Sequence, residues 1–244
     1  MELYMNMVTN LGDWFTKVGM QFYDAFFVDK RYIAYFKGLT VTLEISILAI
    51  LIGVLIGVLV AVLKVSATNY KGLKWVDTLC NIYINVIRGT PVFLQLLIIY
   101  NLVFTSRDSS EVVVAAICFG INSGAYVAEI VRAGIESIDK GQNEAGRSLG
   151  LNSNQTMFYI IMPQAIKNIL PALGNEFITL IKETSVASII AVTDLTKVAQ
   201  YIGSRTWVIL PPLFIAAIFY LVIVLGIAKL INILERRLGQ GDHN

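Results

Sequence analysis

Seven polar residues lie inside segments of the sequence that are otherwise apolar. Their side chains are ionisable or carry a hydroxyl group, and they are Ser123, Tyr126, Glu129, Lys182, Thr184, Ser185 and Ser188. A polar side chain at membrane depth costs free energy, so it usually faces a cavity, a partner or a solute pathway. The chemistry that we expect from these residues is reversible binding of a polar solute through hydrogen bonds and ion pairs.

Two structural explanations compete with a solute site. Glu129 and Arg132 are three residues apart, so on a helix they can pair with each other near one end of a span. The hydroxyl groups can also hold neighbouring helices together by hydrogen bonds. The sequence leaves these alternatives open.

Other kinds of chemistry find no support in the sequence. The single histidine, His243, lies in a polar tail, and the two cysteines, Cys80 and Cys118, lie in apolar runs where inert buried thiols are expected. No GxxxxGK[ST] motif is present to cradle phosphates. The net charge of +2 offers little attraction to nucleic acid. We therefore expect no covalent catalysis, metal ion, nucleotide or nucleic acid on this chain.

The elements that position the polar residues are predicted to be membrane-spanning helices. Hydrophobic residues make up 56% of the 244 residues and charged residues 15%, whereas a soluble domain has about 25% charged residues. About 20 apolar residues in a helix cross a bilayer. The sequence predicts an all-α polytopic membrane protein with about five crossings, at Ile45–Leu63, Trp75–Phe104, Val112–Arg132, Pro171–Val192 and Trp207–Ala228. Gly53 and Gly57 in the first crossing have the GxxxG spacing of a close helix contact.

Two of these crossings contain predicted interruptions. Pro91 has no N–H and its ring clashes with the preceding turn, so the second crossing is predicted to bend or break at Arg88, Gly89, Thr90 and Pro91. Arg88, beside this bend, is a candidate gate or helix-end residue. The polar run Lys182–Ser185 is predicted to interrupt the fourth crossing.

Lysine and arginine are unevenly divided between the two sets of loops that connect five crossings. One set contains Lys64, Lys71, Lys74, Arg132, Lys140, Arg147, Lys167, Lys229, Arg236 and Arg237, and the other contains Arg107, Lys197 and Arg205. Because cytoplasmic loops are enriched in these residues, the N-terminus is predicted outside and the C-terminus in the cytoplasm. The preceding segment Leu11–Phe27 has aromatic residues mainly three or four apart, which predicts an amphipathic helix in the outer interface.

A polar segment with the sequence EAGRSLGLNSNQTMFYIIMP connects the third and fourth crossings. We expect a first helix over Glu144–Leu149, closed by Gly150 in a left-handed conformation. Asn152, with Gln155 three residues later, is typical of the N-terminus of a second helix over about Ser153–Met162. Pro163 is expected to end that helix.

This segment resembles the cytoplasmic signature of the membrane subunits of ABC importers. That signature consists of Glu-Ala-Ala, a Gly six residues after the Glu, and Ile-x-Leu-Pro at a fixed distance. The matching residues are Glu144, Ala145, Gly150, Ile160 and Pro163, while Gly146 replaces the second Ala and Met162 replaces Leu. The resemblance implies that the signature loop (residues 140–165) couples to a separate ATPase subunit through Glu144, Ala145, Gly146, Gly150, Ile160 and Pro163.

Further motifs narrow the resemblance to the permeases for polar amino acids, of the histidine, glutamine and arginine type. They are Arg88–Pro91, Tyr126–Arg132, Gly141-Gln142 and Lys182–Ser185 with Ser188. The resemblance covers about Lys37–Leu234 and divides the chain into an interfacial segment (1–36), an importer-type transmembrane domain (37–238) and a polar tail (239–244).

The resemblance also implies the partners and the location of the chain. The partners are an ATP-binding cassette ATPase that binds ATP and Mg, an extracytoplasmic amino-acid-binding protein, and a second permease subunit, identical or different. The expected location is a bacterial inner or plasma membrane, crossed several times. The implied mechanism is alternating access, with an amino acid held by Glu129, Ser123 and Tyr126 opposite the fourth crossing.

Three other functions stay open from the sequence. The first is an importer permease for another small solute, such as a metal chelate, an osmolyte or a sulfur compound. The second is a channel or ion-driven transporter, and the third is a membrane scaffold or sensor. The signature loop argues against the second, and polar residues at membrane depth argue against the third.

Overall fold

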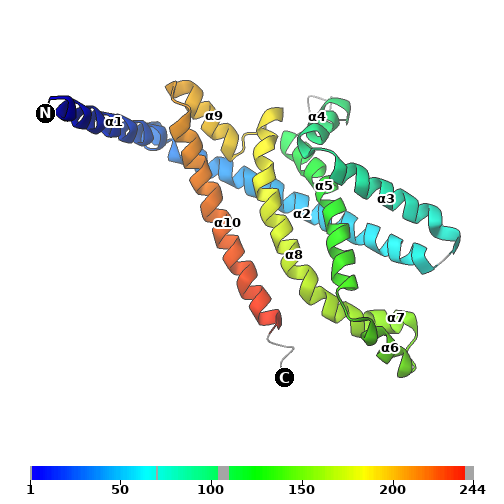
Figure 1. Cartoon of the computed structure of the whole chain (residues 1–244). Coiled ribbons are helices and arrows are strands. Elements are labelled where there is room, and N and C mark those ends of the chain that lie inside the picture. Colours follow the sequence, from blue (N-terminus) through cyan, green and yellow to red (C-terminus); the bar gives the residue numbers. More distant parts are fainter. Residues whose placement is uncertain (1, 70, 104–109, 240–244) are drawn as a thin grey trace.

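The computed structural model describes residues 2–69, 71–103 and 110–239, and this part of the chain is almost entirely helical (Figure 1). The α-helices are α1 (Glu2–Phe26), α2 (Tyr32–Asn69), α3 (Lys74–Gly89), α4 (Val92–Val103), α5 (Glu111–Glu136), α6 (Lys140–Ser148), α7 (Ser153–Thr156), α8 (Met162–Glu183), α9 (Leu195–Thr206) and α10 (Leu210–Gly239). Shorter helical turns are η1 (Val28–Lys30), η2 (Lys71–Leu73), η3 (Met157–Ile161) and η4 (Thr184–Ile190). The predicted end of the second crossing at Phe104, together with Arg107 and residues 240–244, lies outside the described residues.

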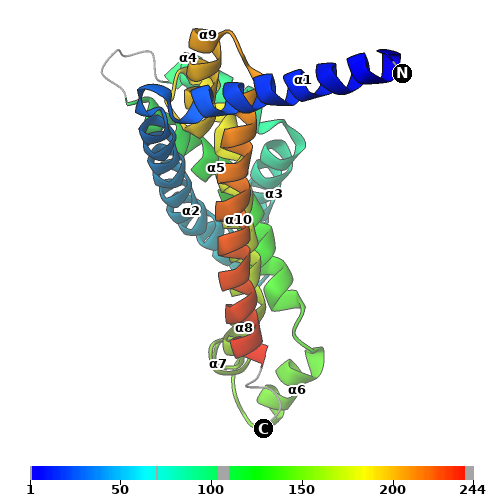
Figure 2. The ribbon, with the colours of Figure 1, turned by 90° about the vertical axis from the view of Figure 1, so that its left-hand side faces the viewer.

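The long helices α2, α5, α8 and α10 form the body of the molecule. α8 packs against both α5 and α10, and α2 packs along α5 (Figure 1). The largest apolar core joins α2, α4, α5 and α8 through buried residues that include Ile45, Leu96, Phe119 and Leu180. In both views α1, α4 and α9 lie at one end, and α6 and α7 lie at the other (Figures 1 and 2).

Glycines on both partners allow α2 and α5 to approach closely. A Cβ atom on Gly57 would lie 2.5 Å from Val127 Cβ, and one on Gly53 would lie 2.8 Å from Ser123 Oγ. On α5, a Cβ atom on Gly120 would lie 2.6 Å from Ile52 Cγ2. The GxxxG spacing in the first predicted crossing therefore marks a helix contact within this chain.

The apolar helices confirm an all-α membrane fold. Three segments of the described chain are long and apolar enough to cross a bilayer: Val28–Ala67, Glu111–Glu136 and Leu210–Leu238. α3 and α4 add a fourth only if they count as one span bent by 108°. α8 is not among these segments; its polar residues include Gln164, Lys167, Asn168, Asn175 and Glu176. Five crossings therefore stay a prediction.

The second predicted crossing is interrupted at the predicted motif, and its two parts are bent by 108°. α3 ends at Gly89, and Thr90 adopts an extended conformation with φ −121° and ψ 144° before α4 begins at Val92. Pro91 has no N–H to donate to the preceding turn and its ring clashes with that turn, so a helix bends or breaks there. The bend predicted at this motif is confirmed.

The fourth and fifth predicted crossings have different bounds. Pro171 lies inside α8 instead of near its start, and α8 gives way to the 3-10 turn η4 at Thr184, where the polar run predicts an interruption. α9 is absent from the prediction. It begins after Asp194, whose carboxylate accepts hydrogen bonds from the N–H groups of Thr196 and Lys197, and this arrangement stabilises a helix start.

α1 joins α2 through a tight elbow. Asp29 and Lys30 have positive φ values of 52° and 56°, a conformation that costs free energy for residues other than glycine. Arg31 stabilises the elbow because its Nη1 donates to the carbonyl of Asp24 at 2.7 Å. The predicted amphipathic segment is confirmed as a helix, since it lies within α1. α1 lies across the direction of α10 (Figure 2). The place of α1 in the outer interface stays a prediction.

Candidate functional site

The signature loop contains a tight turn between two helices. The carboxylate of Asp139 accepts from the N–H of Gly141 at 2.6 Å and caps α6. Gly150 follows α6 with φ 84°, and the N–H of Leu151 reaches the carbonyl of Gly146 at 3.1 Å. The left-handed conformation predicted for Gly150 is confirmed.

The start of α7 also matches its predicted geometry. The side chain of Asn152 accepts from the N–H of Gln155 at 3.0 Å, and the side chain of Gln155 accepts from the N–H of Asn152 at 2.9 Å. These reciprocal hydrogen bonds form a capping box. The turn between α6 and α7 is thus fixed by local hydrogen bonds.

Gly146 brings α6 against the second half of the loop. It is buried, and a Cβ atom there would lie 2.8 Å from both Ile160 Cδ1 and Thr156 Cγ2. Gly146 and Ile160 therefore share one contact inside the loop. The glycine at this position, where the signature has alanine, allows that close approach.

The prediction that Pro163 ends the second helix is wrong. The chain stays helical from Ser153 through the π-helical turn Met157–Ile161 and into α8, which contains Pro163 in its first turn. A proline is tolerated there because its missing N–H is not needed at a helix start. The N–H of Met162 instead reaches the carbonyl of Met157, five residues earlier.

The outer surface of the signature loop is unusually apolar for a polar segment. Leu149 and Tyr159 are 81% and 74% exposed. Glu144 and Ala145 are also exposed, on α6. The loop therefore offers an apolar surface with a carboxylate beside it.

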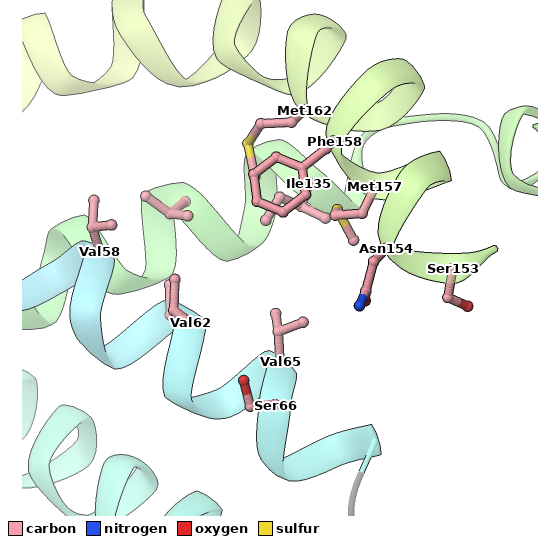
Figure 3. A pocket seen from close by; sticks show the side chains of 12 residues that line it. Val58, Val62, Val65, Ser66, Ile135, Ser153, Asn154, Met157, Phe158 and Met162 are labelled. Carbon is pink, nitrogen blue, oxygen red and sulfur yellow. The ribbon is translucent and has the colours of Figure 1, made fainter. Parts of the chain in front are cut away.

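An apolar groove of about 600 Å³ separates the signature loop from α2 (Figure 3). Val58, Val62 and Val65 of α2 form one wall, and Met157, Phe158 and Met162 lie on the other side (Figure 3). The groove leaves space between the loop and the apolar body of the molecule.

A charged cluster lies where α3 ends against α5. Arg88 Nη1 lies 3.4 Å from Glu129 Oε2, and the Arg88 guanidinium lies 5.3 Å from the centre of the Tyr126 ring. Arg132 Nη2 lies 2.8 Å from the same carboxylate oxygen and also pairs with Glu136. The predicted Glu129–Arg132 pair is present, and the structure adds Arg88 as a second partner of Glu129.

Two polar residues that the sequence did not single out join helices through side-chain hydrogen bonds. Gln95 of α4 accepts from Asn122 at 2.9 Å, and its amide donates to the carbonyls of Ile87 and Thr90. These carbonyls lie at the end of α3, where Pro91 interrupts the helix. Gln95 therefore ties the bend to α5, and only the position of a polar side chain one turn after Pro91 signals this role in the sequence.

Glu176 of α8 is the second missed residue. It accepts a hydrogen bond from Ser123 Oγ at 2.7 Å, and this bond joins α5 to α8. Ser123 is fully buried. One predicted pathway residue therefore holds two helices together in this structure.

The remaining predicted pathway residues lie apart from this cluster. Thr184 and Ser188 donate to their own helical turn, at the carbonyls of Ile181 and Ser185. Lys182 and Ser185 line a separate groove of about 380 Å³ between α8 and α10. In the described part of the chain, no hydrogen bond or ion pair joins them to Arg88 or Glu129.

Asp194 is a buried carboxylate near the end that carries α9. Besides capping α9, it accepts from the hydroxyl of Tyr220 at 3.3 Å. Burial raises the pKa of its carboxyl above the ordinary value, and hydrogen bonds from the N–H groups of Lys197 and Thr196 oppose that rise. Over the described ranges, no group of three His, Cys, Asp or Glu side chains is placed to hold a metal ion.

Comparisons with known proteins agree on one family. The family described as "Binding-protein-dependent transport system inner membrane component" matches residues 49–240. The arginine transport system permease protein ArtQ of Bacillus subtilis is 38% identical over 210 residues, which cover 84% of this chain and 93% of that protein. The L-cystine transport system permease protein TcyB of Bacillus subtilis is 37% identical over 203 residues, which cover 82% and 85%.

Solved structures have the same fold. A crystal structure of an amino acid ABC transporter with histidines matches with a TM-score of 0.80 and 45% identity, and the match covers 85% of this chain and 95% of that chain. An inward-facing structure of the MetNI methionine ABC transporter matches with a TM-score of 0.64 and 18% identity over 83% of this chain and 97% of that chain. The second likeness concerns the fold alone.

Proposed function

The chain belongs to the family of binding-protein-dependent transport system inner membrane components and is a permease subunit of an amino acid ABC importer, and from this premise we propose that it imports polar amino acids. Its similarity to permeases named for arginine and L-cystine, and to a transporter crystallised with histidines, supports this substrate class. An amino acid carries an ammonium and a carboxylate group, so its site needs an acceptor and a donor close together.

The exposed apolar surface of the signature loop is the observation that supports coupling to a separate ATPase subunit. Leu149 and Tyr159 would lose contact with water if they entered a groove on a partner, and burial of apolar area is the main favourable term in association. In the proposed arrangement, Glu144 and Ala145 contact an ATPase subunit that binds ATP and Mg. Gly146, Gly150, Ile160 and Pro163 hold the loop in the shape that this contact needs.

The proposed substrate pathway includes the charged cluster. Glu129 would accept from the ammonium of the amino acid, and Arg88 would donate to its carboxylate, because these opposite charges already lie 3.4 Å apart. Ser123 and Tyr126 lie on the same helix as Glu129. Lys182, Thr184, Ser185 and Ser188 would contact the solute at another stage of its passage. The bend at Gly89, Thr90 and Pro91 would position Arg88 as a gate.

The proposed mechanism is alternating access in a dimer of permease subunits. A loaded binding protein docks outside, ATP closes the partner ATPases, and the two signature loops move together while the helices rock around the central site. The N-terminus would lie outside and the signature loop inside the cell. Coupling between two sites is reciprocal in binding free energy, so docking outside is expected to change events at the ATPase.

Reconstitution tests this proposal. The chain would be purified with the ATPase and binding protein encoded beside it and placed in liposomes, and ATPase activity would be measured with a panel of amino acids. Stimulation by one or a few polar amino acids is expected. Stimulation by another class of solute would move the assignment to a different importer, and uptake without ATP would support an ion-driven transporter instead.

A further inference from the structure

A basic cleft lies between the α1–α2 elbow and α9. Its volume is about 640 Å³. The cations among its lining residues are Lys30, Arg31, Lys37 and Arg205, and the lining includes only one carboxylate, that of Asp29. The cleft therefore carries an excess of positive charge.

Most of this charge is not neutralised within the described chain. Arg31 pairs with Asp29 at 3.1 Å and is also engaged at the elbow. The other three lining cations have exposed side chains and no carboxylate oxygen within 4.0 Å among the described residues, and they are Lys30, Lys37 and Arg205. Lys197 stands over the ring of Tyr201, a lining residue, at 5.4 Å and adds a cation beside the cleft.

The cleft lies at the end of the molecule where positive charge is not expected from membrane topology. The elbow and α9 lie at the end of the molecule opposite α6 and α7 (Figures 1 and 2). In the proposed topology this end is outside the cell, where the positive-inside rule leads one to expect few lysines and arginines. Membrane topology therefore does not account for these cations, whereas an acidic partner does.

We propose that this cleft is the docking site for an acidic protrusion of the extracytoplasmic amino-acid-binding protein, an inference that rests on the proposed function. Carboxylates that enter the cleft would pair with Lys37 on α2 and Arg205 on α9, and so would contact both walls. Ile33, Ala34 and Ile202 add apolar lining that suits protein side chains better than a lone phosphate group. Opposite charges of this kind steer association and set its salt dependence.

The test is a charge reversal at both walls. The Lys37→Glu/Arg205→Glu variant, in complex with its ATPase, would be reconstituted into phosphatidylcholine liposomes and titrated with loaded binding protein. The concentration that gives half-maximal ATPase stimulation is expected to rise about tenfold at low salt, with the same maximal rate, because rim charges act mainly on association. The wild-type titration is expected to weaken with added salt, which screens attraction between opposite charges, and the variant is expected to lose this dependence because those attractive pairs are gone.

Two further variants separate docking from general effects. Lys37→Gln/Arg205→Gln removes charge without reversal and is expected to give a smaller change in the same direction. Lys17→Glu on α1 changes an exposed lysine at the same end but outside the cleft, and it is expected to leave the titration unchanged. A melting temperature measured for each complex shows whether its fold is intact.

The possible results distinguish this inference from the proposed function. Equal titrations for the wild type and both cleft variants would overturn the docking site while leaving the importer assignment intact. A defect that occurs only in liposomes containing phosphatidylglycerol would assign the cleft to an anionic lipid headgroup and would also overturn it. A wild-type complex that no loaded binding protein stimulates would contradict the proposed function, and this inference with it.

Discussion

Glu129 pairs with two arginines, and the proposed amino acid site depends on this shared arrangement. It is shared by Arg88 from α3 and Arg132 from its own helix. Partly exposed ion pairs contribute only about 0–1 kcal/mol to stability, so breaking the Arg88–Glu129 pair costs little. A zwitterion that enters between these two side chains would replace their mutual contact with one ion pair to each.

Removal of either side chain should therefore weaken transport more than stability. We expect Arg88→Ala and Glu129→Gln to raise the half-saturating amino acid concentration for uptake about tenfold, which corresponds to about 1.4 kcal/mol. Glu136→Gln is the matched control, because Glu136 pairs with Arg132 and not with Arg88. Uptake into ATP-loaded proteoliposomes measures this, and equal concentrations for all four proteins would exclude the cluster from the pathway.

The contact between α2 and α5 depends on glycines that leave no space for a larger side chain. Gly57→Leu would place its Cβ atom 2.5 Å from Val127 Cβ, so the helices must separate. Overpacking of this kind costs about 1–3 kcal/mol. The melting temperature of the purified protein should fall, whereas Gly226→Leu on α10 should have little effect because no atom lies within 4 Å of its added Cβ. Equal melting temperatures for the two variants would contradict this packing.

The bend between α3 and α4 depends on Gln95. Gln95→Leu would leave the carbonyls of Ile87 and Thr90 without the amide that now donates to them. The bond to Ile87 is partly buried, and an unpaired buried acceptor costs about 1–3 kcal/mol, whereas the exposed Thr90 carbonyl can bond to water instead. A lower melting temperature is expected. Asn101→Leu is the control, since Asn101 donates to Leu97 on its own helix. A bend held by Pro91 alone would give the same stability in both variants.

The parts of these elements that the sequence predicts are local. Gly150, Asn152 and Gln155 act within a few residues of one another, so their turn and capping box are readable from the order of residues. The interruption at Pro91 follows from the ring of one residue. Contacts over long separations, such as Ser123 with Glu176, depend on which helices pack together and are not readable in this way.

The end predicted at Pro163 and the omission of α9 have the same cause, because the local sequence in each case is compatible with more than one structure. Pro163 can start a helix as well as end one, and the preceding π-helical turn, which joins the helices, has no distinctive composition. α9 is short and carries polar residues among its apolar ones, so it resembles a loop between crossings. Its start is signalled by Asp194, a common helix cap.

The predicted orientation of the molecule in the membrane rests on the uneven division of lysine and arginine among the loops. Because α1 and α9 lie at one end and the signature loop at the other, a single orientation fixes every loop. In a variant with Cys80 and Cys118 replaced, we expect a cysteine introduced in place of Ser204 on α9 to react with a membrane-impermeant maleimide in intact spheroplasts. A cysteine at Ser148 on α6 should react only after the membrane is opened. The reverse pattern would invert the assignment of both ends and remove the docking proposal.

The proposed function requires the signature loop to couple the permease to its ATPase, and the turn at Gly150 offers a way to disturb that coupling. Gly150 has φ 84°, where a β-branched residue is strained by at least about 1–2 kcal/mol and asparagine is tolerated. In proteoliposomes with the ATPase and loaded binding protein, Gly150→Val should lose stimulated ATPase activity and uptake together, while Gly150→Asn retains them. Gly72→Ala, where no atom lies within 4 Å of the added Cβ, should match the wild type. Full stimulation and uptake in Gly150→Val, with the complex intact, would contradict a coupling role for this loop.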